Sequence, residues 1–163
     1  MNADSPTQQK TPRTQPKIPR TIWVLVGAAF IIALGYGLIA PVLPQFAGSF
    51  GVSMAAAGAV ISIFAFARLI GAPGAGRLVD RLGSRPIYLT GLLIVAASTF
   101  FVAFAQAYWQ ILALRFIAGF GSTMFTLSAQ ALIVRVTHPS IRGRANALYA
   151  SAFLVGNVVG PII

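Results

Sequence analysis

The chain has 163 residues, of which 57% are hydrophobic and only 9% are charged, and its mean hydropathy is +0.82. Soluble domains carry about 25% charged residues, so this composition excludes a water-soluble domain and indicates a membrane protein. The net charge of +10 comes from basic clusters between long apolar runs rather than from one continuous face, which argues against nucleic-acid binding. With no cysteine, one histidine and two acidic residues, the sequence predicts no metal site, no cofactor and no catalytic acid–base pair.

The N-terminal segment, residues 1–20, is polar and rich in proline, so we expect a disordered cytosolic tail. An uncharged run over residues 21–43 follows and is long enough to cross a hydrocarbon core as a helix. A signal peptide is the alternative interpretation. Its apolar part usually has ~7–15 residues, and further apolar runs follow here, so the sequence favours a first membrane span.

Four more apolar runs follow the first, and the last of them is still running at the final residue. They cover residues 54–75, 87–105, 108–134 and 145–163. Tyr108 and Trp109 have amphipathic rings that settle at a membrane interface, so they mark the turn between the third and fourth runs. The sequence predicts an all-α transmembrane helical bundle over residues 21–163, with four complete spans and most of a fifth.

Basic residues alternate between the connections. They lie in the tail, between the second and third spans, and between the fourth and fifth, whereas the other two connections carry none. Because Lys and Arg near span ends stay on the cytoplasmic side, this pattern predicts a multi-pass protein of the cell membrane with a cytosolic N-terminus.

Two arginines, Arg68 and Arg115, interrupt predicted spans. An arginine at the bilayer centre costs a few kcal/mol on insertion scales, so each should face a bundle interior or a polar cavity. The alternative is that each long side chain reaches the nearer membrane interface. For Arg115 we favour the functional interpretation.

The connection between the second and third spans has the most specific spacing in the chain. A helix that continues to Asp80 makes Arg77 and Asp80 neighbours, Gly83 permits a left-handed turn, and Pro86 suits the first turn of the next helix. A plain solvated loop is the other interpretation of such a charge cluster.

This connection resembles that of the major facilitator superfamily. The matching residues are Gly76, Asp80, Arg81, Gly83 and Arg85, whereas Ser84 stands where a basic residue is common. The resemblance implies a conformational latch, in which Asp80 engages the other half of the transporter and Arg81 and Arg85 hold it in place.

Two further motifs are similar to those of the same family. Arg115 and Gly119 resemble a motif linked to proton coupling, which implies a coupling or cavity role. Gly156, Gly160 and Pro161 resemble the start of a motif associated with antiporters. A packing seam of small residues explains Gly156 and Gly160 as well, because both glycines fall on one helical face.

The resemblance covers residues 22–163 and includes residues 35–44, which are similar to the first span of twelve-span drug and proton antiporters. It implies a partial N-terminal six-helix half of a fold in which two halves rock about a midplane site. The implied partners are the lipid bilayer, a small-molecule substrate, protons, and a C-terminal half that lies outside this chain.

The implied function is a portion of a secondary active transporter, with proton-coupled efflux of small apolar or drug-like molecules as the leading hypothesis. No predicted span contains Asp or Glu, which counts against proton coupling within this part of the protein. The alternatives are a metabolite or sugar uptake carrier, a uniporter, and a membrane scaffold without transport activity. Polar residues that could line a cavity or join helices are Tyr36, Gln45, Gln106, Ser122, Thr123, Thr126, Ser128, Gln130 and Asn157.

Overall fold

A computed structural model describes residues 18–162, so most of the predicted tail, residues 1–17, lies outside the described part. The described residues contain helices and connections, with no strand. This confirms the predicted all-α fold class. The helices are α1 (Arg20–Gly48), α2 (Met54–Leu82), α3 (Ser84–Val102), α4 (Tyr108–Val136) and α5 (Arg142–Val159), and short 3₁₀ turns η1 (Pro139–Ile141) and η2 (Gly160–Ile162) flank α5.

Five helical segments in the described part are long and apolar enough to cross a membrane, the fifth being α5 with its flanking turns. Several helices begin or end at residues other than the limits of the predicted apolar runs. Helix α2 continues through residues 76–82, which the hydropathy pattern left outside the span. Backbone hydrogen bonds extend a helix beyond the apolar residues, because charged side chains on its last turns reach water.

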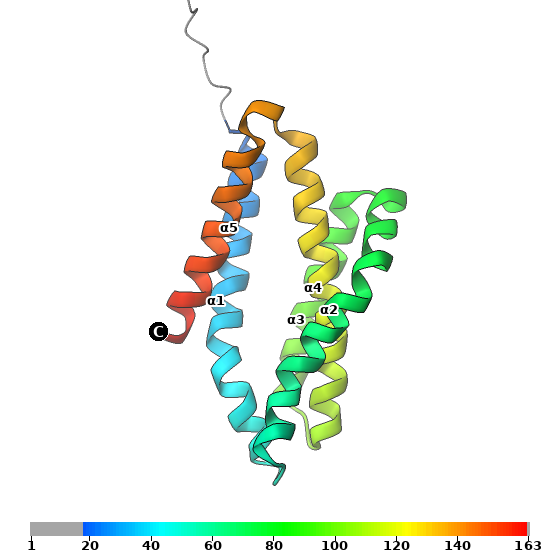
Figure 1. The fold of residues 1–163 in the computed structure, drawn as a ribbon, viewed down its shortest axis with the longest axis vertical. Coiled ribbons are helices and arrows are strands. Elements are labelled where there is room, and N and C mark those ends of the chain that lie inside the picture. The colour runs from blue at the N-terminus through cyan, green and yellow to red at the C-terminus, as the bar shows by residue number, and fades with distance from the viewer. Residues whose placement is uncertain (1–17, 163) are drawn as a thin grey trace, which may run out of the picture.

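The helices form two groups, which Figure 1 shows side by side. Helices α2, α3 and α4 pack closely together, and α1 packs along α5. The single-residue connection between α2 and α3 and the connection between α4 and α5 lie at one end of the bundle, hereafter the basic end. The connections at residues 49–53 and 103–107 lie at the opposite, uncharged end.

Two apolar clusters join the two helix groups. Near the basic end the cluster contains Ile22, Leu25, Ala29, Tyr88, Phe125, Ala129, Ile133, Ala145 and Tyr149. Near the uncharged end it contains Leu43, Ala47, Ala57, Val60, Val102 and Ile111. Each cluster draws residues from α1 and from the α2–α4 group, so the groups are held together at both ends.

The outer surface of the bundle is apolar between its two ends. Large hydrophobic side chains on it include Trp23, Val24, Leu89, Leu93 and Phe100, each more than half exposed. Water would make so much exposed apolar surface unfavourable, whereas lipid chains cover it without cost. The exposed surface and the five long apolar helices therefore identify a multi-pass membrane protein.

Candidate functional site

The connection between α2 and α3 is one residue long. Gly83 joins the helices with a φ of +89°, in the region that only glycine adopts readily, and its N–H donates to the Val79 carbonyl at 3.0 Å. Gly76 lies in the last turns of α2, and Pro86 lies in the first turn of α3. The chain reverses here because Gly83 adopts a backbone conformation that is strained for a residue with a Cβ atom, and Pro86 lies in the first turn of α3, where no backbone donor is needed.

Asp80 is exposed on the last turns of α2. Within residues 18–162 its carboxylate makes no ion pair and no hydrogen bond, so the structure does not bring Arg81 or Arg85 into contact with it. Both arginines are also exposed at the basic end. The carboxylate is therefore open to a partner that approaches this end of the bundle.

Arg115 of α4 is 4% exposed, so its side chain lies inside the bundle rather than at the membrane interface. The guanidinium carbon lies 5.9 Å from the centroid of the Phe64 ring on α2, within the range of a cation–π contact. The Phe64 ring in turn lies 5.5 Å from the ring of Tyr36 on α1. Three helices thus contribute to the environment of one buried cation.

The charged group of Arg115 is incompletely satisfied. Its Nε and Nη2 atoms are buried and have no hydrogen-bond partner within the described residues. Leaving a buried donor unpaired costs about 1–3 kcal/mol, and more for a charged group. Such a group in a native structure calls for an explanation, such as an ordered water, a functional role or a partner from outside residues 18–162.

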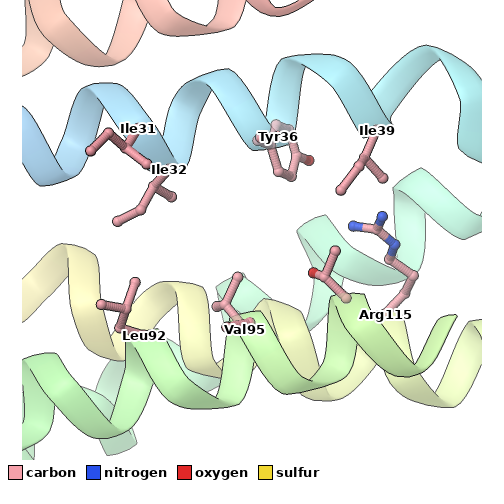
Figure 2. Close-up of a pocket in the computed structure, with 10 residues that line it drawn as sticks. Ile31, Ile32, Tyr36, Ile39, Leu92, Val95 and Arg115 are labelled. Carbon is pink, nitrogen blue, oxygen red and sulfur yellow. The ribbon is translucent and has the colours of Figure 1, made fainter. Parts of the chain in front are cut away.

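A cavity of about 210 Å³ lies beside Arg115, between α1, α3 and α4 (Figure 2). Its walls are mostly apolar, and its polar lining residues are Tyr36, Thr99 and Arg115. The full lining is Ile31, Ile32, Gly35, Tyr36, Ile39, Leu92, Val95, Ala96, Thr99 and Arg115. We refer to it as the Arg115 cavity.

Gly119 sets the distance between α4 and α2. A Cβ atom on Gly119 would lie 2.5 Å from the Phe64 carbonyl oxygen and 2.8 Å from the Ala67 Cβ atom. The absence of a side chain therefore allows the close helix contact that brings Arg115, one turn earlier, against the Phe64 ring. Sequence reasoning named Gly119 and Arg115 but missed Phe64, because nothing in an apolar run marks which of its aromatic residues turns inward.

Arg68 lies near the midpoint of α2, is exposed, and borders two hollows of about 420 and 370 Å³. Polar residues of α4 and α5 line the same hollows, namely Thr123, Thr126, Gln130, Asn146 and Tyr149. The Thr123 hydroxyl donates to the Arg68 carbonyl at 3.2 Å, which ties α4 to α2 at this level. We call this surface the Arg68 groove.

Gly156 and Gly160 lie at the contact between α5 and α1. A Cβ atom on Gly160 would lie 2.7 Å from the Leu34 carbonyl oxygen, so the two backbones are nearly in contact. Pro161 is exposed in η2, where the α-helix has ended. The structure thus places both glycines in a packing seam of small residues.

The latch residues, the Arg115 cavity and the glycine seam lie in separate regions of the bundle. The first is at the basic end, the second lies between the two helix groups, and the third lies between α1 and α5. The sequence did not single out Asn146 or Tyr149, which join Arg68 in its groove. An isolated polar residue in a fifth helix gives no signal of its neighbours, because helix rotation is not fixed by one sequence.

Comparison with known proteins adds to this geometry. The chain is 30% identical over 141 residues to Multidrug resistance protein 1 of Bacillus subtilis (strain 168). The aligned residues make up 86% of this chain and 36% of that protein. It is 32% identical over 143 residues to Quinolone resistance protein NorA of Staphylococcus aureus (strain MRSA252). The aligned residues here make up 87% of this chain and 37% of that protein. The chain therefore spans little more than a third of the length of these curated relatives. Residues 25–163 match the Major Facilitator Superfamily, and the chain belongs to this family of transporters.

Proposed function

We propose that this chain forms the N-terminal portion of a secondary active transporter that exports small apolar or drug-like molecules by alternating access. Family membership supports transport in general. The names of the two relatives, which refer to multidrug and quinolone resistance, support efflux of drug-like molecules. Because the matched regions cover 36% and 37% of those relatives, we infer that the functional protein also needs a second half.

The observation that carries this proposal is the Arg68 groove. Arg68, Gln130 and Asn146 are exposed side chains on three helices that are apolar enough to span a membrane. A lipid-facing surface does not carry an arginine, an amide and hydroxyls together, because hydrocarbon cannot solvate them. The groove is best explained as one wall of a water-accessible pathway, with the opposite wall supplied by the other half.

We infer that the basic end faces the cytosol. Arginines on the helix ends that flank the α2–α3 and α4–α5 connections gather there, and the cost of translocating them keeps them on the cytoplasmic side. In this orientation Asp80, open at the basic end, is placed to act as a latch on the partner half. Gly83 shapes the helix reversal that follows Asp80, Gly76 lies about one turn before Asp80 in α2, and Arg81 and Arg85 add positive charge beside it.

Proton coupling would use carboxylates outside the described helices. Asp80 is the only acidic residue in the described part of the chain, and it lies at the basic end rather than in the interior. Arg115 and Gly119 are then proposed to help coupling by placing a buried positive charge beside the cavity. A proton-independent uniporter or an uptake carrier fits the same helices and is the second candidate.

Transport by the whole protein in inverted membrane vesicles tests the proposal. An imposed proton gradient should drive accumulation of a lipophilic fluorescent dye such as ethidium, and a protonophore should abolish it. Dye that equilibrates across the membrane without accumulating, at a rate unaffected by protonophore, would favour the uniporter. Vesicles that contain the protein but show no gradient-driven or passive transport of any dye or sugar would favour the scaffold. A polypeptide of residues 1–163 alone is expected not to transport.

A further inference from the structure

We propose that the Arg68 groove binds drug-like molecules in which a carboxylate is joined to an apolar body, and that the Arg68 guanidinium binds the carboxylate. This inference rests on the proposed function, because it names a substrate class for the same pathway wall. The juxtaposition that carries it is an exposed arginine at the middle of a membrane-spanning helix, bordered by polar and apolar side chains of two other helices.

A ligand can reach the guanidinium of Arg68. The side chain is exposed, and it lines both hollows of the groove. Arg68 lies at the middle of α2, so each end of the helix is ~21 Å away along its axis. At this depth an exposed cation needs a polar or anionic neighbour, because hydrocarbon cannot solvate it.

The backbone that carries Arg68 is held against α4. The Thr123 hydroxyl donates to the Arg68 carbonyl at 3.2 Å. The preceding residue, Ala67, is fully buried, and its Cβ atom would lie only 2.8 Å from a Cβ atom on Gly119. Binding at this site therefore requires no ordering of the backbone, which reduces the entropic cost of holding a ligand.

The polar groups of the groove favour a carboxylate as the ligand. A guanidinium presents two parallel N–H donors, which match the two oxygens of a carboxylate. Gln130 and Asn146 are exposed on the same hollow, and their amide groups can donate further hydrogen bonds to these oxygens. A carboxylate side chain from the other half of the protein is the alternative partner for Arg68, and the ligand pair below distinguishes the two.

The apolar groups of the groove favour a ligand with an apolar body. Leu69 and Leu154 border the two hollows and are 72% and 65% exposed. The hollows of about 420 and 370 Å³ both fall within the ~300–1,000 Å³ of small-molecule pockets. The apolar part of a drug-sized ligand can therefore pack on these side chains while its carboxylate meets Arg68. The other apolar lining residues are Ala65, Ala72, Leu127, Ala150 and Phe153.

Naphthoate is a suitable probe, and naphthamide is its neutral isostere. We would measure binding of radiolabelled naphthoate to the whole protein in phosphatidylcholine nanodiscs without any gradient. The expected result is saturable binding, with naphthamide at least about tenfold weaker than unlabelled naphthoate as a competitor.

Arg68→Gln should remove the preference for the carboxylate. We expect it to weaken naphthoate binding at least about tenfold and to change competition by naphthamide by less than about twofold, because only the carboxylate uses the charge. Arg77→Gln is the matched control. Arg77 is exposed on the same helix, ~14 Å further along and on the opposite side, so its replacement should leave naphthoate binding unchanged.

A pair of tryptophan variants tests the groove without altering Arg68. Ala150 of α5 lines the groove, whereas the adjacent Ser151 is exposed outside its lining. Ala150→Trp should occupy the space of the ligand and reduce naphthoate binding at least about tenfold, and Ser151→Trp should leave it unchanged. Thermal unfolding of each variant in detergent shows whether it is folded, and the Ala150 variant keeps the test valid if Arg68→Gln is unstable.

Several outcomes would overturn the proposal. These are equal competition by naphthoate and naphthamide, unchanged naphthoate binding by Arg68→Gln, and equal effects of the two tryptophan variants. An equal loss of both ligands in Arg68→Gln would instead assign Arg68 to a carboxylate of the other half. The absence of saturable naphthoate binding to the wild-type protein would also refute the carboxylate site.

The binding and transport measurements fail independently. Dye transport without naphthoate binding would refute the carboxylate site and leave the transporter assignment standing. Naphthoate binding without transport of any solute would refute the transporter assignment and leave the binding site standing.

Discussion

Ala33 of α1 and Gly156 of α5 lie so close that a Cβ atom on Gly156 would be 2.6 Å from the Ala33 Cβ atom. The Phe30 carbonyl would lie only 2.7 Å from the same position. Neither neighbour is the movable end of a flexible side chain, so the helices themselves must separate to admit a methyl group. This contact fixes how α5 lies along α1.

Replacing Gly156 with Ala should therefore destabilise the bundle. We expect a loss of about 1–3 kcal/mol in the free energy of unfolding, the usual cost of overpacking. Thermal unfolding of the purified protein in detergent would measure it. Gly143 on the same helix has nothing within 4 Å of its Cβ position, so Gly143→Ala is the matched control and should change stability by less than about 1 kcal/mol. Equal melting temperatures for the two variants would contradict the packing described here.

Two glycines of the latch motif should behave differently when each is changed to alanine. Gly83 has a φ of +89°, which strains any residue with a Cβ atom, so Gly83→Ala should cost about 1–2 kcal/mol. Gly76 is helical with open space at its Cβ position, so Gly76→Ala should be neutral or stabilising by up to about 1 kcal/mol. Melting temperatures would test both. If the Gly76→Ala protein is as stable as wild type but transports poorly, this glycine is needed for the motion of the two halves rather than for folding.

The sequence predicted the helical class and the order of elements because charge-free runs of this length have few alternatives to membrane helices. It placed the helix ends less well, because hydropathy marks where the lipid ends rather than where the helix ends. Helix α2, for example, continues beyond its apolar run to Leu82. It also left open whether Arg115 reaches an interface. Its 4% exposure depends on the rotation of α4 and on the close contact at Gly119, which are properties of the packed bundle.

The same limit applies to the candidate site. Spacing along the chain was enough to select Asp80 and Gly83, because a helix reversal is a local structure. Phe64 and Asn146 escaped notice because their significance comes from neighbours on other helices. One sequence gives the residues on each helix but not the face that each helix turns inward.

The absence of cysteine in the chain makes the orientation directly testable. Ser49 and Ser140 are exposed in connections at opposite ends of the bundle, and each can be changed to Cys. In intact cells a membrane-impermeant maleimide should label Ser49→Cys and leave Ser140→Cys unlabelled until the cells are opened. The reverse pattern would place the N-terminus outside the cell.

Neutralising Asp80 should separate transport from stability. Asp80 is exposed without a partner in the described residues, so Asp80→Asn should change the free energy of unfolding by less than about 0.5 kcal/mol. Gradient-driven dye transport by the whole protein should nevertheless fall at least tenfold if the carboxylate engages the other half, which is about 1.4 kcal/mol of lost interaction.

Arg135→Gln is the control for Asp80→Asn, because it removes another exposed charge from the same end and lies outside the latch motif. Its transport rate should stay near that of wild type, with protein amounts compared by immunoblot. Retained transport in Asp80→Asn would rule out the latch role, and a loss of protein abundance without any change in specific transport rate would favour the scaffold.

The two apolar clusters and the hollow between them have a mechanical consequence. Because the middle of α1 packs against Gly156 and Gly160 of α5, any outward movement of α1 at the Arg115 cavity would carry α5 with it. Pro41 and Pro44 interrupt the hydrogen-bond ladder of α1 near the uncharged end, which lowers the energy needed to bow the helix. A change in the width of this cavity would then displace α1 and α5 together, as one unit, relative to α2, α3 and α4.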